Sequence, residues 1–471
     1  MGRRPPRRAD RRPRGHPPRD PARRAAFDVL RAVRERDAYA NILLPALLRE
    51  RGLDARDAAL ATELTYGTLR GRESYDAILR VCTDRRLSKV DPPLLDLLRL
   101  GAHQLLRTRI PAHAAVAATV GLTREALGEG QARFANAVLR KVATRDADAW
   151  LAIVAPDDET DPIGHLAVVH SHPRWIVTAI RDALGGDLEE TALALAANNA
   201  RPRVTLLAKP GRIDRAELTA MLPRGAGEPA RWSPYAVHLA DGDPAAIPAV
   251  RDGRAAAQDE GSQLVALALI NFELDGTDAR WLDLCAGPGG KAALLAGRAR
   301  ERGGRLLAVD VQAHRAGLVR EAVGDLASVV IADGRRGSWR AGGFDRVLVD
   351  VPCTGLGALR RRPEARWRRT PDAIAALGPL QRALLASGLE AARPGGIVAY
   401  VTCSPHLAET VQVVEDVLKE RREVEPVDAR PCFPGVPDLG GGPYVQLWPH
   451  RHGTDAMFCA LLRNSKGGGG A

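Results

Sequence analysis

The stretch DLCAGPGGK, at positions 283–291, lies between a short apolar run and a helical pattern. Its glycines allow the backbone to turn sharply and to approach a bound molecule closely. A helix that begins near Gly290 would offer free N–H groups at its start. The spacing fits neither a P-loop, because Ala292 follows Lys291, nor the G-x-G-x-x-G dinucleotide fingerprint. The loop therefore predicts a nucleotide-type site of another kind.

From about residue 279, short apolar runs alternate with helical patterns. Buried strands that alternate with helices are typical of a doubly wound, mostly parallel sheet, which binds ligands at the carboxyl ends of its strands. We therefore predict a Rossmann-like α/β domain over residues 258–463. The five strand candidates are residues 280–284, 305–309, 328–331, 346–349 and 397–401.

Three acidic residues follow successive strand candidates: Asp310, Asp333 and Asp350. A carboxylate after the second strand can accept both hydroxyls of a ribose, and one after the third can accept an adenine amino group. Phosphate would favour cations there, so the set suits a nucleoside without phosphate, such as S-adenosylmethionine. The simpler interpretation is that each Asp caps a helix. Their common register around the glycine-rich loop favours the cofactor site.

Two cysteines lie just beyond the fourth and fifth strand candidates, Cys353 in DVPCTG (350–355) and Cys403 in TCSP (402–405). A buried cysteine is usually an inert small apolar residue. Their matched placement, however, favours one shared site beside the cofactor. Methylation of carbon 5 of cytosine needs such thiols, because a thiolate that adds to carbon 6 makes carbon 5 reactive. A second thiol can assist release, and Asp350 can hydrogen-bond the cytosine edge.

The remaining chain predicts further domains, since 471 residues at roughly 150 per domain suggest about three. Residues 21–148 show a helical pattern throughout, and residues 149–257 predict a linker, rich in Asp and Pro at 150–165, followed by a small α/β segment. We expect the Arg- and Pro-rich arm 1–20 and the tail 464–471 to be disordered.

Cysteine spacing and hydropathy indicate the kind of protein. The six cysteines form no CxxC pair, which argues against a disulfide framework and a structural zinc site. No apolar run approaches the roughly 18 residues of a membrane span. We expect a cytoplasmic, monomeric protein that binds neither a metal nor a membrane.

The net charge of +11 is concentrated in two places. Residues 1–24 hold ten Arg and two Asp, residues 360–369 hold six Arg and one Glu, and the rest is nearly balanced. A general bias toward Arg explains part of this. We nevertheless predict that the arginines of 360–369 hold RNA phosphates and that Trp367 stacks on a base.

The motifs DLCAGPGGK, DVPCTG and TCSPHLAE (402–409) resemble those of the RsmB-type (Sun/Fmu) RNA cytosine-5 methyltransferases, whose characterised members modify small-subunit ribosomal RNA. Further matching runs are QDEGSQ (258–263), NNARP (198–202) and RRRPEARWRR (360–369). The N-terminal part resembles that family's NusB-like, all-helical RNA-binding domain through ELTYGTLR (63–70), LRLGAHQLL (98–106) and FANAVLR (134–140).

This resemblance implies that Cys403 is the nucleophile, that Cys353 aids product release and that Asp350 assists. It also implies a site for S-adenosylmethionine, bordered by Arg315 and formed by Cys285, Ala286, Gly287, Pro288, Gly289, Gly290, Lys291, Asp310, Asp333 and Asp350. The departures from the family pattern, Thr354 for Ser and Val351 for Ala, are mild. The implied partner is RNA, foremost 16S ribosomal RNA. The alternatives are the same chemistry on transfer RNA or another RNA, and a non-catalytic RNA-binding or assembly factor.

Overall fold

The computed structural model describes residues 20–337 and 339–465, and the chain divides into two compact units, Met1–Ala155 and Pro156–Ala471. Nearly all of the arm predicted at 1–20 and of the tail predicted at 464–471 lies outside the described residues. Asp20 is described, and its side chain accepts a hydrogen bond from the Arg23 backbone N–H at the start of the first helix. Asn464 ends the last strand.

The first unit is helical, as predicted for this part of the chain. Its helices are α1 (Pro21–Arg36), α2 (Ala40–Glu50), α3 (Ala55–Arg70), α4 (Arg72–Cys82), α5 (Pro92–Arg107), α6 (Ala112–Leu127), α7 (Glu129–Val142) and α8 (Ala147–Val154). Helix α5 begins at Pro92 because proline is tolerated in a first turn, where its missing N–H costs nothing. Apolar side chains at helical spacing form two cores, one around Phe27 and one around Tyr75.

Residues 150–165 were expected to form a linker. The boundary between the two units does fall within this range, but the ends of the range are helical. Helix α8 extends to Val154, and α9 (Pro162–Val169) begins within the same stretch. Asp161, one of the aspartates that suggested a linker, is instead the N-cap of α9, and its side chain accepts a hydrogen bond from the Gly164 backbone N–H. Asp146 caps α8 in the same way, through the Ala149 backbone N–H. Only the short segment between the two helices connects the units.

The second unit begins with two separate parts. Helices α9, α10 (Arg174–Ala183) and α11 (Leu188–Asn199) pack against Leu356, Leu359 and Trp448 of the C-terminal region. A four-stranded antiparallel sheet follows, ordered β2-β3-β1-β4. Its elements are β1 (Val204–Ala208), α12 (Arg215–Ala220), β2 (Gly227–Pro229), β3 (Ala236–Leu239), α13 (Pro248–Arg251) and β4 (Ala255–Ala257).

The large sheet confirms the doubly wound, mostly parallel prediction, with strand order β10-β12-β9-β8-β5-β6-β7 and β11 paired to β12. All five predicted strands occur: β5 (Arg280–Asp283), β6 (Arg305–Asp310), β7 (Ala327–Ile331), β8 (Phe344–Asp350) and β9 (Ala392–Thr402). The prediction missed the antiparallel addition beside β9, which consists of β10 (Val424–Val427), β11 (Val445–Gln446) and β12 (Phe458–Asn464). The short helix α17 (Ala365–Arg368) lies between β8 and β9, and α20 (Pro449–His452) lies between β11 and β12.

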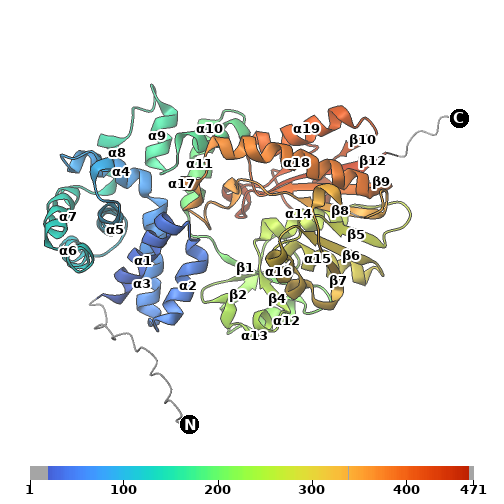
Figure 1. Ribbon diagram of the computed structural model, residues 1–471, viewed down its shortest axis with the longest axis horizontal. Helices are drawn as coiled ribbons and strands as arrows, with labels where there is room; N and C mark the ends of the chain where they lie inside the picture. Colours follow the sequence, from blue (N-terminus) through green and yellow to red (C-terminus); the bar gives the residue numbers. More distant parts are fainter. Residues whose placement is uncertain (1–19, 338, 466–471) are drawn as a thin grey trace, which may run out of the picture. The chain divides into compact units, whose positions relative to one another are not determined.

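Helices cover both faces of this sheet (Figure 1). Because neighbouring strand residues point to opposite faces, Trp281 enters one core and Leu282 the other. The first core includes α14 (Glu260–Asn271), α15 (Gly290–Glu301) and α16 (Ala313–Val323); the second includes α18 (Pro371–Ala391) and α19 (Val411–Glu420). Burial on both faces leaves the strand ends and their loops to carry the site.

Candidate active site

The loop from β5 to α15 is held tightly by its glycines. Gly289 caps α15 with φ of +111°, and a Cβ there would come within 2.5 Å of the Ala322 side chain. A Cβ on Gly287 would come within 2.4 Å of the Asp310 carboxylate. Position 289 therefore requires glycine, whereas a Cβ on Gly287 would displace the Asp310 carboxylate. The backbone N–H groups at the start of α15 have no side-chain cap among the described residues and stay open for a ligand.

Asp310 ends β6 directly against this loop. Its carboxylate accepts hydrogen bonds from the backbone N–H groups of Gly287 at 3.1 Å and Gln312 at 2.9 Å, and Arg315 lies 3.4 Å away. Arg315 also donates to the Gly287 carbonyl. Each carboxylate oxygen has a second lone pair, so Asp310 can still accept a ribose hydroxyl.

Asp333 lies two residues beyond β7, whose last residue pairs in register with Asp310 of β6. Both of its carboxylate oxygens accept hydrogen bonds from Arg335. These hydrogen bonds lower the pKa of Asp333 to about 2 and keep it ionised. Its contact with an adenine amino group stays a prediction, and Arg335 would have to share the carboxylate.

The two predicted thiols meet. The Sγ atoms of Cys353 and Cys403 lie 3.3 Å apart, because β8 and β9 pair in parallel and each cysteine follows the end of its strand. This separation is a hydrogen bond rather than the roughly 2.05 Å of a disulfide, and both cysteines are free. The hydrogen bond from Cys353 and the positive charge of Lys291 lower the pKa of Cys403 despite burial. The same hydrogen bond, with burial, raises the pKa of Cys353.

Lys291 links the cofactor loop to the thiols. Its Nζ donates to Asp350 Oδ2 at 2.8 Å, and this pair lies at the end of β8. Although burial lowers the pKa of Lys291, the attraction of Asp350 raises it above the ordinary value, so the lysine is a cation. The sequence analysis placed Lys291 only in the cofactor loop, whereas here its positive charge also acts on Cys403.

Asp283 at the end of β5 is a further buried group of the site. It is 1% exposed, and within the described residues its Oδ2 has no hydrogen-bond partner. Burial and the nearby Asp350 raise its pKa to about 8, so it is protonated at neutral pH. A buried carboxyl with one oxygen free is suited to a cationic group of a ligand, such as the ammonium of an amino acid moiety, which would displace its proton.

This raised pKa predicts a pH effect on stability. The folded chain keeps a proton that the unfolded chain releases near pH 4, so the free energy of unfolding falls as pH rises from about 4 to about 8. Asp283→Asn keeps the shape of the side chain but removes the group that titrates. We compare the free energies of unfolding of this variant and the wild type by urea unfolding. As the pH rises from about 5 to about 9, we expect the difference to shift in favour of the variant by at least about 2 kcal/mol. In the exposed control Asp372→Asn, stability should depend on pH as it does in the wild type. If stability in Asp283→Asn also showed the wild-type pH dependence, the raised pKa of Asp283 would be contradicted.

The structure corrects the prediction that the arginines of 360–369 hold RNA phosphates. Arg360 and Arg361 both bind the carboxylates of Asp259 and Asp455, at distances from 2.6 to 3.0 Å. Arg366 is 0% exposed and donates to carbonyl oxygens of the α9–α11 region. Three of the six guanidinium groups thus hold the protein together instead of RNA phosphates.

Removal of the Arg366 side chain should be costly. The guanidinium donates to Ser171 O at 2.9 Å, Asn199 Oδ1 at 2.8 Å and Asn198 O at 3.3 Å. Arg366→Ala leaves these buried acceptors without that donor and creates a cavity, so we expect a loss of about 3 kcal/mol in denaturant unfolding. The more exposed Arg369→Ala should change stability by less than about 0.5 kcal/mol. Equal effects from both would argue against a structural role for Arg366.

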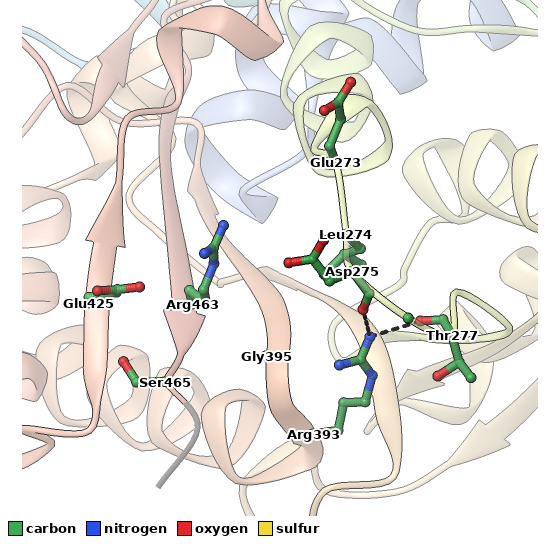
Figure 2. A pocket seen from close by; sticks show the side chains of 10 residues that line it. Glu273, Leu274, Asp275, Thr277, Arg393, Gly395, Glu425, Arg463 and Ser465 are labelled. Carbon is green, nitrogen blue, oxygen red and sulfur yellow. Dashed lines mark hydrogen bonds between the residues drawn. The ribbon is translucent and has the colours of Figure 1, made fainter. Parts of the chain in front are cut away.

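A separate pocket lies at the other end of the sheet, near the start of β9 (Figure 2). It has a volume of about 650 Å³, and in it Arg393 donates to the carbonyl oxygens of Asp275 and Thr277. None of the predicted site residues lines it. Within residues 20–337 and 339–465, no cluster of His, Cys, Asp or Glu could hold a metal ion, and no helix could cross a membrane.

The glycine-rich loop, open helix N-terminus and acidic strand ends fit S-adenosylmethionine, and the fold is that of the Rossmann-like methyltransferases. Comparison with known sequences narrows this class. Residues 271–463 match the family described as 16S rRNA methyltransferase RsmB/F, and residues 20–144 match the NusB family. The chain belongs to the RsmB/F family and is an S-adenosylmethionine-dependent RNA methyltransferase with a NusB-family N-terminal region.

Similar proteins cover nearly the whole chain. A Mycobacterium tuberculosis protein whose name gives the methyltransferase class without a substrate is 55% identical over 95% of this chain and 97% of its own length. The ribosomal RNA small subunit methyltransferase B of Pseudomonas syringae is 33% identical over 93% and 96%. Among solved structures, PH0851 is similar with a TM-score of 0.76 at 21% identity, over 94% of this chain and 98% of that one. NSun6 from Pyrococcus horikoshii, solved with SFG, has a TM-score of 0.52 at 19% identity, over 62% and 98%.

Proposed function

We propose that this protein methylates carbon 5 of a cytosine in small-subunit ribosomal RNA, through a covalent bond between Cys403 and the base. The observation that carries the proposal is the pair of free thiols 3.3 Å apart, with a lysine–aspartate pair beside them. The small-subunit target is supported by the names of relatives that align along most of the chain.

In the proposed reaction, the Cys403 thiolate adds to carbon 6 of the cytosine, and its electron pair makes carbon 5 nucleophilic. Asp350 and Lys291 hold the polar edge of the ring and balance the charge that develops on it. S-adenosylmethionine, held by the loop 285–291 with Asp310 and Asp333, supplies the methyl group. Cys353 then takes part in removing the proton from carbon 5, after which the sulfur of Cys403 leaves with its electron pair.

The cytosine has to leave its stack to reach the thiols, because carbon 6 is not accessible to a side chain inside a base-paired stem. The exposed Arg362 and the half-buried Trp367 follow the Cys353 loop in the chain. They remain candidates for contact with the flanking RNA. Arg360, Arg361 and Arg366 do not, since their guanidinium groups are bound within the protein.

The test uses the full-length protein, labelled S-adenosylmethionine and two separate RNAs, small-subunit ribosomal RNA and transfer RNA. We expect label in the ribosomal RNA, recovered as 5-methylcytidine after digestion and mass spectrometry. Label in transfer RNA alone would show that transfer RNA is the substrate. A methyl group on another atom would overturn the proposed chemistry. No transfer to any RNA would favour a non-catalytic assembly factor.

A further inference from the structure

A buried glutamate holds the loop that carries Cys353. Glu409 ends a short 3-10 turn after β9, Leu407–Glu409, and is 0% exposed. Its Oε1 accepts hydrogen bonds from the Thr354 backbone N–H at 2.8 Å and Gln381 Nε2 at 3.2 Å, and its Oε2 accepts from the Thr354 hydroxyl. Gln381 Nε2 also donates to Pro352 O at 2.9 Å. Glu409 and Gln381 thus bind the residues on both sides of Cys353.

In these contacts Glu409 is a hydrogen-bond acceptor, as a carboxylate is. Both the backbone N–H and the amide N–H₂ can only donate, so Oε1 carries no proton. The described part of the chain places no lysine or arginine in an ion pair with Glu409, and its donors are all neutral groups. Its negative charge is therefore poorly screened in a buried setting, where a charge acts more strongly than in water.

The two thiols face different charges. Cys353 adjoins Glu409 through Thr354. The hydrogen bond with Cys403, burial and the charge of Cys403 raise the pKa of Cys353 most, and Glu409 and then Asp350 raise it further. The hydrogen bond from Cys353 lowers the pKa of Cys403 most. Burial, Asp350 and Asp455 raise this pKa, and Lys291 lowers it by attracting the thiolate. Asp350 raises the pKa of both thiols, so it discriminates little between them. Glu409 raises the pKa of Cys353, whereas Lys291 lowers that of Cys403.

We propose that Glu409 is a positioning residue that selects the nucleophile: its carboxylate keeps Cys353 a neutral thiol, so that the single negative charge of the thiol pair resides on Cys403. Two sulfurs 3.3 Å apart do not both ionise easily, and a fixed charge on one side decides which one does. Lys291 acts in the same direction from the other side. The role of Cys403 as nucleophile rests on the proposed function, but the ionisation of the pair is a property of the free protein.

The experiment measures which thiol is ionised, without RNA or cofactor. Iodoacetamide reacts with thiolates, and both cysteines are partly exposed. Alkylation rates of each cysteine are followed against pH by peptide mass spectrometry. In the wild type at neutral pH we expect Cys403 to react at least about tenfold faster than Cys353. In Glu409→Gln, which keeps an acceptor oxygen and the side-chain size, we expect this ratio to fall by about tenfold.

Two matched variants separate charge from loop structure. Thr354→Ala removes a hydrogen bond to Glu409 but keeps its charge, and Glu415→Gln removes an exposed charge from α19; both should keep the wild-type ratio. An unchanged ratio in Glu409→Gln, or an equal drop in Thr354→Ala, would overturn the proposal. So would faster alkylation of Cys353 in the wild type. Failure of methyl transfer to ribosomal RNA would instead reject the proposed function and leave the alkylation ratio unaffected.

Discussion

Replacement of Cys403 by alanine should abolish methyl transfer while cofactor binding persists. We expect the rate to fall at least about 10⁴-fold, as when other enzymes lose a covalent nucleophile. The reason is local: the thiol with the lowered pKa lies beside Lys291, and the neighbouring Cys353 is held as a neutral thiol. Cys353 follows β8 rather than β9, and its sulfur lies 3.3 Å from that of Cys403, so it does not take the position of the missing nucleophile.

Cofactor binding provides the second readout. The loop 285–291, Asp283 and Asp310 keep their contacts when Cys403 is shortened, because their hydrogen bonds run to each other, to the backbone and to Arg315. The dissociation constant for S-adenosylmethionine, measured by calorimetry, should change by less than about threefold. Cys432, a buried cysteine of the core, provides a matched control, because Cys432→Ala should retain activity. Activity retained by Cys403→Ala would place the nucleophile elsewhere.

The sequence predicted the central sheet well because its five parallel strands are short apolar runs with a consistent rhythm. It predicted the meeting of Cys353 and Cys403 for the same reason: both follow strands that are neighbours in such a sheet. Two of the three antiparallel strands, β10 and β11, escaped prediction because their patterns are weak. β10 has two exposed residues among its four and includes Pro426, and β11 has only two residues.

The arginine run was misinterpreted because its partners are distant in the chain. Asp259 lies 101 residues before Arg360, and Asp455 lies 95 residues after it, so no local pattern shows the pairing. The protonated state of Asp283 and the role of Glu409 could not be predicted either, because burial and charge balance are properties of the packed structure. The TCSPHLAE motif did contain Glu409, but a motif alone does not distinguish a buried carboxylate from a solvated one.

The chemistry of Cys353 changes once Cys403 is bonded to the base. In the free protein, the first cause of the raised pKa of Cys353 is its hydrogen bond with Cys403. When Cys403 becomes a thioether on carbon 6, it holds no negative charge and accepts a hydrogen bond only weakly. Cys353 then ionises more easily and becomes a better base, at the stage when the proton of carbon 5 has to be removed.

Cys353→Ala should therefore trap the covalent intermediate. Addition of Cys403 still occurs, but removal of the proton and release of the sulfur become slow, so we expect turnover to fall by about 10²-fold or more. A protein–RNA adduct should then appear on a denaturing gel and carry label from the RNA. The double variant Cys353→Ala, Cys403→Ala should give no adduct, because the bond to carbon 6 requires Cys403. Normal turnover without an adduct in Cys353→Ala would remove Cys353 from the mechanism, and an adduct in the double variant would show that another residue attacks the base.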